Sequence, residues 1–201
     1  LTVTGSPAAL NSSGVAQVLL NSAIAGNDYQ VRALTGSGDV IDTSAVFIVQ
    51  ARASAGFTFD LPPGYVVEAG KTQPIVVTAV DINGNRDSLY TAKVALTASG
   101  GDFEITPDSV AFVKGQGTFS VRARATGTYN LTTADAGVLS TDLTNYTVNA
   151  APVDRLSFAG LADTPAGAGR FFFVRAYDSL SNLVNDSAGL VIELQQISGP
   201  P

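Results

Sequence analysis

Four residue types, cysteine, methionine, tryptophan and histidine, are absent from this sequence of 201 residues. Without cysteine the chain forms no disulfide and has no thiolate for catalysis or metal binding. Without histidine it lacks the commonest general base and the usual ligand of zinc, copper and haem. These absences argue against an enzyme and against a transition-metal cofactor. They also favour the exterior of a bacterial cell, because small secreted eukaryotic domains usually carry disulfides.

Charge is also scarce, since 14% of the residues are charged and the formal net charge is −6. No basic cluster offsets this acidity, so repulsion from phosphates argues against nucleic acid as a partner. No apolar run reaches the roughly 18 residues of a membrane helix, and we expect no membrane insertion. Leu1 is not a start residue, so we expect a processed or excised piece of a longer chain.

Short runs of alternating apolar and polar residues dominate the sequence, which is the pattern of half-buried β-strands. The alternating apolar positions are Ile75, Val77 and Ala79; Val94 and Leu96; Phe119, Val121 and Ala123; Tyr129 and Leu131. Twenty glycines and nine prolines punctuate the chain, and no stretch keeps a helical period. About seven or eight short strands between Gly56 and Ala150 predict an all-β sandwich.

The strand runs recur along the chain. The central part matches the C-terminal part, Gly56–Phe59 with Arg155–Phe158 and Gln73–Asp81 with Arg170–Asp178. The N-terminal part matches the end of the central part, Gly14–Val18 with Gly117–Val121, Tyr29 with Tyr129, and Phe47–Ala51 with Tyr146–Ala150. A repeat of about one hundred residues predicts an array of modules.

This alignment divides the chain into three parts and predicts tandem immunoglobulin-like β-sandwich repeats. Residues 1–51 are expected to form the C-terminal half, or a small version, of one repeat. Residues 52–151 form a complete repeat, and residues 152–201 form the N-terminal half of a further one. The joints Gln50–Ala55 and Asn149–Val153 are short. Short joints favour a semi-rigid rod over a flexible string.

The central part has a recognisable order of elements. An apolar strand runs into the turn Asp81-Ile-Asn-Gly-Asn85, and strands at Ala92–Ala98 and Gln116–Ala123 follow, then Gly127-Thr-Tyr. This order resembles the bacterial immunoglobulin-like domains of invasin- and intimin-type surface proteins and is less similar to filamin-type repeats. The resemblance implies secreted or cell-surface rods, stalks and matrix components without catalysis. The last half-copy departs from it, because Asp178-Ser-Leu-Ser-Asn182 has no glycine.

One loop is a candidate calcium site. Its side-chain oxygens stand at alternate positions, Asp81, Asn83, Asn85 and Asp87. Calcium takes about six to eight oxygen ligands, and a tight loop of this spacing can supply several. A strand-to-strand turn explains the same residues, because Asn and Gly accept positive φ and Asp bonds to nearby backbone amides. Arg86 and the lack of a bidentate glutamate favour the turn, and we expect no other cofactor.

Two further patterns have a functional and a structural interpretation. Four acids could supply the carboxylate pair of a glycosidase: Asp60, Glu68, Asp102 and Glu104. Nothing in the sequence places a pair across a cleft, and solvated strand faces explain them. Several aromatic residues could stack on sugars: Phe57, Phe59, Tyr146 and Phe171–Phe173. Aromatic residues in the strands of a sandwich are more often core, and we favour that interpretation.

We therefore expect a non-enzymatic extracellular or cell-surface structural protein, a module of a stalk, matrix or filament. Half a sandwich cannot bury a core, so Leu156–Pro201 of one subunit could pair with Leu1–Ala51 of the next and propagate an open filament by strand complementation. The partners would then be other copies of the chain or neighbouring repeats. The alternatives are an excised piece of an array, a small independent sandwich at Leu1–Ala51, and an adhesin module that binds a host protein or glycan receptor.

Overall fold

The computed structural model describes residues 1–135, 139–160, 162–163, 165, 168–185 and 191–195. Within these ranges the chain forms seventeen β-strands and no helix. The described part of the chain therefore contains no helix with the length and apolar character that crossing a membrane requires. The prediction of an all-β fold is confirmed.

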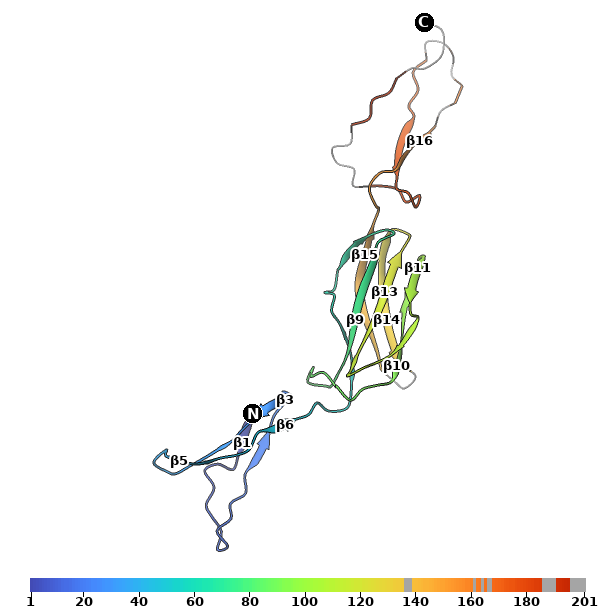
Figure 1. The fold of residues 1–201 in the computed structure, drawn as a ribbon. Helices are drawn as coiled ribbons and strands as arrows, with labels where there is room; N and C mark the ends of the chain where they lie inside the picture. The colour runs from blue at the N-terminus through green and yellow to red at the C-terminus, as the bar shows by residue number, and fades with distance from the viewer. Residues whose placement is uncertain (136–138, 161, 164, 166–167, 186–190, 196–201) are drawn as a thin grey trace.

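The centre of the chain is a two-layered sandwich (Figure 1). Its described residues form nine strands: β7 (Gly56–Phe59), β8 (Val66–Glu68), β9 (Thr72–Val80), β10 (Lys93–Ala98), β11 (Phe103–Thr106), β12 (Ser109–Ala111), β13 (Gln116–Ala123), β14 (Gly127–Asp135) and β15 (Ser140–Asn149). One sheet has the order β11-β13-β9-β7 and the other β12-β10-β14-β15-β8. This is an immunoglobulin-type sandwich, with β9 between β7 and β13 and β14 between β10 and β15.

The core of the sandwich comes from the alternating apolar positions of the sequence. Ile75, Val77 and Phe119 of one sheet are 0% exposed, as are Val94 and Leu131 of the other. Because successive side chains of a strand point to opposite faces, one apolar residue in two is enough to build this layer. The alternation therefore predicted the core face of β9, β10, β13 and β14 correctly.

The N-terminal part contains six described strands: β1 (Thr2–Thr4), β2 (Leu19–Asn21), β3 (Gly26–Tyr29), β4 (Arg32–Leu34), β5 (Val40–Thr43) and β6 (Phe47–Val49). They pair as β1-β2, β3-β6 and β4-β5. Tyr29 pairs with Phe47 as Tyr129 pairs with Tyr146 in the sandwich. The pairs β3-β6 and β4-β5 therefore correspond to the β14-β15 hairpin, and β1-β2 corresponds to β11-β13.

Backbone conformation offers a second register for the N-terminal part. Gly14 has φ 74° and Gly115 has φ 75°, and each lies in the turn before the matched strand. On this criterion Gly14 corresponds to Gly115, two residues before the Gly117 that the sequence alignment matched with it. In this second register Val18 corresponds to Phe119.

The C-terminal part contains two described strands, β16 (Arg155–Ala159) and β17 (Phe173–Tyr177), which pair antiparallel. The core interpretation is confirmed for Phe57 and Tyr146, which are 3% and 0% exposed. It is wrong for Phe171–Phe173, whose side chains are 93%, 37% and 65% exposed. Among the described residues β17 pairs only with β16, so no second sheet covers these aromatic rings.

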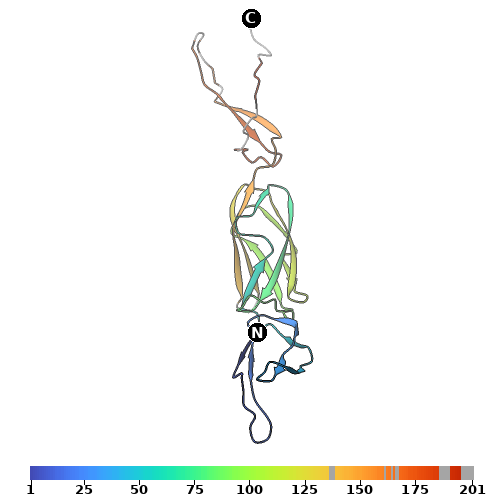
Figure 2. The ribbon, with the colours of Figure 1, turned by 90° about the vertical axis from the view of Figure 1, so that its left-hand side faces the viewer.

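The three parts follow one another in the order of the sequence, and in Figure 1 the N-terminal part lies to one side of the long axis of the sandwich (Figures 1 and 2). Strands β3 and β6 lie beyond one pole of the sandwich, and β16 lies beyond the opposite pole. The view turned by 90° keeps the same order, so the elongated arrangement is not an effect of projection. Neighbouring parts therefore meet only at their ends, and the contacts at these boundaries decide how rigid the chain is.

Candidate functional site

Each boundary is bridged by hydrogen bonds from one loop, and at the first boundary this is the loop after β9. Gly84 has φ 79° and donates its N–H to the backbone carbonyl of Asp81 at 2.9 Å. Oδ1 of Asp81 accepts the N–H groups of Asn83 and Asn85, both at 2.9 Å. The loop is thus wrapped around one carboxylate as an Asx-type turn. This is the turn geometry that the Asn-Gly sequence favours.

The side chain of Asn85 carries the loop across to the N-terminal part. Its Nδ2 donates to the carbonyl of Ala23 at 2.8 Å, and its Oδ1 accepts the N–H of Ala25 at 3.0 Å. Nδ2 also lies 3.2 and 3.0 Å from the two carboxylate oxygens of Asp81. The carboxylate therefore orients the amide, and the amide pairs with the backbone of the preceding part as a neighbouring strand would.

The linker that enters the sandwich is held by two carboxylates. Oδ2 of Asp81 accepts the N–H of Arg52 at 3.0 Å. Oδ2 of Asp87 accepts the N–H of Ser54 at 3.1 Å and its hydroxyl at 2.8 Å, while Oδ1 accepts the N–H of Leu89 at 3.0 Å. Both aspartates are buried. The backbone between Arg52 and Ser54 is therefore fixed at both ends, which explains why so short a linker is ordered.

The second boundary repeats the first through Asp178 and Asn182. Oδ2 of Asp178 accepts the N–H of Ala151 at 3.1 Å and Nδ2 of Asn182 at 2.9 Å. Nδ2 of Asn182 donates to the carbonyl of Arg124 at 2.8 Å, and its Oδ1 accepts the N–H of Thr126 at 3.2 Å. The same aspartate-linker and asparagine-peptide contacts therefore occur at both joints, from the same Asp-x-x-x-Asn spacing.

The two joints differ in their second carboxylate. Val184 is the counterpart of Asp87, because each donates its N–H to the matching strand, to Ala176 and Ala79 respectively, at 2.9 Å. Valine cannot accept a hydrogen bond from the linker. In the described part of the chain the first linker is thus held by two side-chain carboxylates, and the second by one.

Hydrogen bonding keeps the carboxylates of Asp81 and Asp178 charged. The side-chain amide of Asn85 is the main cause that lowers the pKa of Asp81 to about 2, and the backbone N–H donors act in the same direction against burial. Burial raises the pKa of Asp178, but the bonds from Asn182 and from backbone N–H groups outweigh it and leave the pKa below its ordinary value. Both groups are therefore ionised acceptors over the whole neutral pH range.

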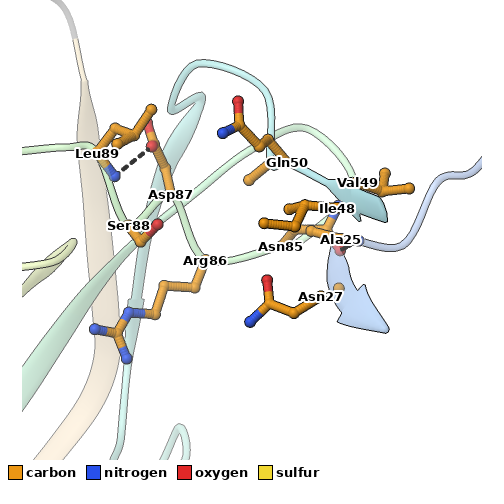
Figure 3. Close-up of a pocket in the computed structure, with 12 residues that line it drawn as sticks. Ala25, Asn27, Ile48, Val49, Gln50, Asn85, Arg86, Asp87, Ser88 and Leu89 are labelled. Atoms are coloured by element: carbon orange, nitrogen blue, oxygen red, sulfur yellow. Dashed lines mark hydrogen bonds between the residues drawn. The ribbon is translucent and has the colours of Figure 1, made fainter. Parts of the chain in front are cut away.

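A groove opens beside each joint. The first, shown in Figure 3, has a volume of about 420 Å³ and is lined by residues that include Asn27, Ile48, Gln50, Arg86 and Leu89. The second, of about 590 Å³, has the matching positions Thr128, Thr147, Asn149 and Leu183 in its wall. The chemistry differs, since an arginine at one joint is replaced by a leucine at the other. The recurring groove is a consequence of the joint geometry and gives no support to a shared ligand.

The candidate calcium residues have separate tasks. Asp81 and Asn85 lie together, Asp87 is directed at the linker, and the side chain of Asn83 is exposed. Asn85 presents Nδ2 rather than its oxygen to Asp81, so a calcium ion would have to displace this donor and several N–H groups. Among the described residues no three His, Cys, Asp or Glu side chains gather as metal ligands do. The calcium site stays an untested hypothesis, and the strand-to-strand turn is the interpretation that we favour.

Two of the acids considered as glycosidase carboxylates form surface ion pairs. Glu68 lies 2.7 Å from Nζ of Lys71, and Glu104 lies 3.5 Å from the guanidinium of Arg124. Sequence reasoning missed Asp178 and Asn182 as site residues. The signal that could have identified them is the recurrence of Asp-x-x-x-Asn directly after equivalent strands.

Comparisons with known proteins give only distant likenesses. No protein-family model and no curated protein matches the sequence. The chain is similar to a glycosyl hydrolase family 2 member from Bacteroides cellulosilyticus, with 16% identity over 67% of this chain and 18% of that chain and a TM-score of 0.46. It is similar to domains 4–9 of the surface layer protein SbsC, with 18% identity over 96% of this chain and 34% of that chain and a TM-score of 0.38. The chain spans only a part of each, and likenesses at this level carry no functional conclusion.

Proposed function

We propose that this chain is a structural segment of a bacterial cell-surface protein, in which sandwiches are joined end to end into a stalk or layer. The observation that carries the proposal is the duplication of the joint. Asn85 and Asn182 make the same pair of bonds to the part before them, and Asp81 and Asp178 hold the linker in the same way. A contact set that recurs with the repeat is what an array needs to keep its modules in line.

In this proposal the joints between the modules have a mechanical role, because they resist bending and pulling. A flexible linker leaves its backbone N–H groups to water and lets the modules swivel. Here the linker N–H groups of Arg52 and Ala151 are bonded to charged carboxylates. Charge-assisted hydrogen bonds are shorter and stronger than neutral ones, so bending or pulling at a joint has to break them first. The joints would therefore set the reach and the stiffness of the stalk.

Composition supports a location outside the cell and a role without catalysis. The chain has no cysteine or histidine and a formal net charge of −6. An acidic surface of this kind favours solubility and disfavours nucleic-acid partners.

Two measurements test this proposal. Small-angle scattering of the purified chain should give the profile of an extended rod, and the joint variants described below should shorten its longest dimension by allowing bends. Antibodies against the central sandwich should label intact cells that express the whole protein, and external protease should remove the label. Exclusive recovery from the cytosol would overturn the surface assignment.

A second candidate function, polymerisation by strand complementation, has one observation in its favour. The N-terminal part has strands that match β11, β13, β14 and β15, whereas the C-terminal part has strands that match β7 and β9. Val18 and Phe172 are 49% and 37% exposed, although their counterparts Phe119 and Ile75 are 0% exposed. Each part thus leaves open the face that the other would cover, and a second copy of the chain could supply it.

A cysteine pair tests polymerisation directly. Phe119 and Ile75 are partners in the β13-β9 ladder, so Val18→Cys and Phe172→Cys on neighbouring subunits would come within disulfide distance. The chain has no cysteine of its own, so every disulfide joins two introduced cysteines. Oxidation should produce a ladder of oligomers, and the matched pair Ser37→Cys with Phe172→Cys should not. A monomer in both cases would overturn polymerisation and leave the stalk proposal intact.

A further inference from the structure

The two joint loops, Asp81–Asn85 and Asp178–Asn182, have the same backbone conformation. They differ at their third residue, which is Asn83 in the first loop and Leu180 in the second. The N–H of each donates to Oδ1 of the loop's aspartate at 2.9 Å. Each is followed by a residue with positive φ, Gly84 at 79° and Ser181 at 71°. The two side chains therefore start from equivalent positions of the same type of turn. They differ in polarity, since one is an amide and the other is apolar.

Leu180 is directed at the end of the central sandwich. It is half-buried and packs against the buried core cluster of that sandwich. Its Cδ1 lies 3.1 Å from the position that a Cβ on Gly70 would take. Ala69, Arg122 and Pro152 also line this place. The absence of a side chain at Gly70 is what leaves room for the leucine.

The seat of Leu180 consists of Ala69, Gly70, Arg122 and Pro152. Contacts within the central sandwich hold the turn at Gly70 in place. Gly70 donates its N–H to the carbonyl of Ala123 at 2.7 Å and accepts Nε of Arg122 at 2.8 Å. Lys71 and Glu68 form an ion pair of 2.7 Å across the same turn. None of these bonds involves the C-terminal part, so the turn at Gly70 is held by the sandwich itself, and Pro152 of the linker adds to the lining.

An apolar residue in the loop is not by itself enough to make this contact. The first loop also contains one, Ile82, but one position earlier, and its side chain is 73% exposed. Ser179 occupies that earlier position in the second loop and is exposed as well. In the second loop it is therefore the third position, and not the second, that packs against the preceding module.

We propose that the sandwich pole around Gly70 is a docking surface for an apolar third residue in the loop of the module that follows, and that Leu180 in this seat sets the angle of the second joint. The partner that fits is a module whose loop reads Asp-x-Leu-x-Asn. A loop with asparagine at that position, as in the first joint, would lose the apolar contact that Leu180 makes with the core cluster of the sandwich. The third loop residue thus determines how the following module is held at this pole. The inference rests on the proposed array function.

Spin labels on the full chain test it, because the only cysteines are those introduced. Labels at Thr118→Cys in the central sandwich and Arg175→Cys in β17 report the distance across the second joint. Leu180→Asn should broaden this distance distribution and make the N–H groups of Ala151 and Thr126 exchange about tenfold faster, which corresponds to about 1.4 kcal/mol. Ser179→Asn, one residue earlier, is the matched control and should change neither.

A double-mutant cycle keeps the test decisive if Leu180→Asn unfolds the C-terminal part. Gly70 has φ 83°, so Gly70→Ala strains the backbone, and its Cβ would also crowd Leu180 and shift the joint. Leu180→Ala should relieve the crowding but not the backbone strain. The two effects on the distance should therefore be non-additive. Additive effects, or a Leu180→Asn distribution equal to that of Ser179→Asn, would overturn the docking surface. Neither result bears on where the whole protein is located, which the cell-labelling experiment decides separately.

Discussion

The amide of Asn85 lies between the carboxylate of Asp81 and the backbone of the N-terminal part. Its Nδ2 is 3.0 Å from Oδ2 of Asp81 and 2.8 Å from the carbonyl of Ala23. The two hydrogens of one NH₂ group thus serve both contacts. Because the carboxylate fixes which way the amide points, the loop offers the same donor and acceptor to the preceding module as long as Asp81 is charged. Asn182 and Asp178 repeat this relationship.

Replacing Asn85 by alanine should loosen the first joint without unfolding the sandwich. The variant removes the bonds to Ala23 and Ala25, which lie outside the sandwich core. A single hydrogen bond contributes about 0.5–1.5 kcal/mol, so the N–H of Ala25 should exchange about tenfold faster. Hydrogen exchange followed by NMR measures this directly.

The control for that variant is Asn83→Ala in the same loop. The side chain of Asn83 is exposed, and this residue is bonded to Asp81 through its backbone N–H, which alanine keeps. Exchange at Ala25 should stay at the wild-type rate. Equal acceleration in both variants would mean that the loop as a whole, and not the amide of Asn85, makes the joint.

The first joint should open in acid. The pKa of Asp81 is lowered from 3.8 to about 2, chiefly by the amide of Asn85. A depressed pKa means that the charged form is favoured in the folded joint, so this contribution is complete above about pH 4 and is lost as the pH falls towards 2. The carboxyl resonance of Asp81 followed by NMR titration should give the low pKa. In Asn85→Ala the pKa should move back towards its ordinary value, and an unchanged pKa would contradict the assigned cause.

The strands of the central sandwich could be predicted well because the alternation of apolar and polar residues is a property of each strand alone. The burial of Ile75, Val77 and Phe119 can be predicted from the alternation of apolar and polar residues in their own strands. The partner of Asn85 could not be found in this way, since Ala25 is sixty positions away and on another module. Phe172 was assigned to a core by the same local rule. It precedes β17, which meets no covering sheet among the described residues, and the local pattern carries no information about that.

Tyr146→Phe should leave the central sandwich equally stable or make it more stable. The ring is 0% exposed, and in the described structure its hydroxyl has no hydrogen-bond partner. Burial raises the pKa of this hydroxyl to about 12, which reflects the same apolar surroundings. Removing an unsatisfied buried hydroxyl should gain about 1 kcal/mol. Chemical denaturation measures the change, and a loss of more than about 1 kcal/mol would mean that the hydroxyl has a bonding role.

Calcium should not change the melting temperature of the chain. Both oxygens of Asp81 already accept N–H donors, and those of Asp87 bond to Ser54 and Leu89. A ligand that binds only the folded state raises the melting temperature, so equal melting with calcium and with chelator is the expected outcome. A rise with calcium that disappears in Asp81→Asn would instead establish the loop as a calcium site.

Gly115→Ala should be among the most damaging single changes in the central sandwich. Gly115 has φ 75°, and a Cβ there would collide with the backbone carbonyl of Asp87. The variant should lose at least about 3 kcal/mol of unfolding free energy, from the left-handed backbone and the displaced aspartate together. Because Asp87 holds the linker at Ser54, the first joint should loosen as well.

Gly84→Ala separates these two causes. Gly84 has φ 79°, close to that of Gly115, but a Cβ there would meet nothing within 4 Å. This variant should lose only about 1–2 kcal/mol, the cost of placing a side chain in the left-handed region. Denaturant unfolding of both variants gives the comparison. Equal losses would show that backbone conformation alone requires glycine at position 115, and the packing of Asp87 against that turn would then have no part in stabilising the joint.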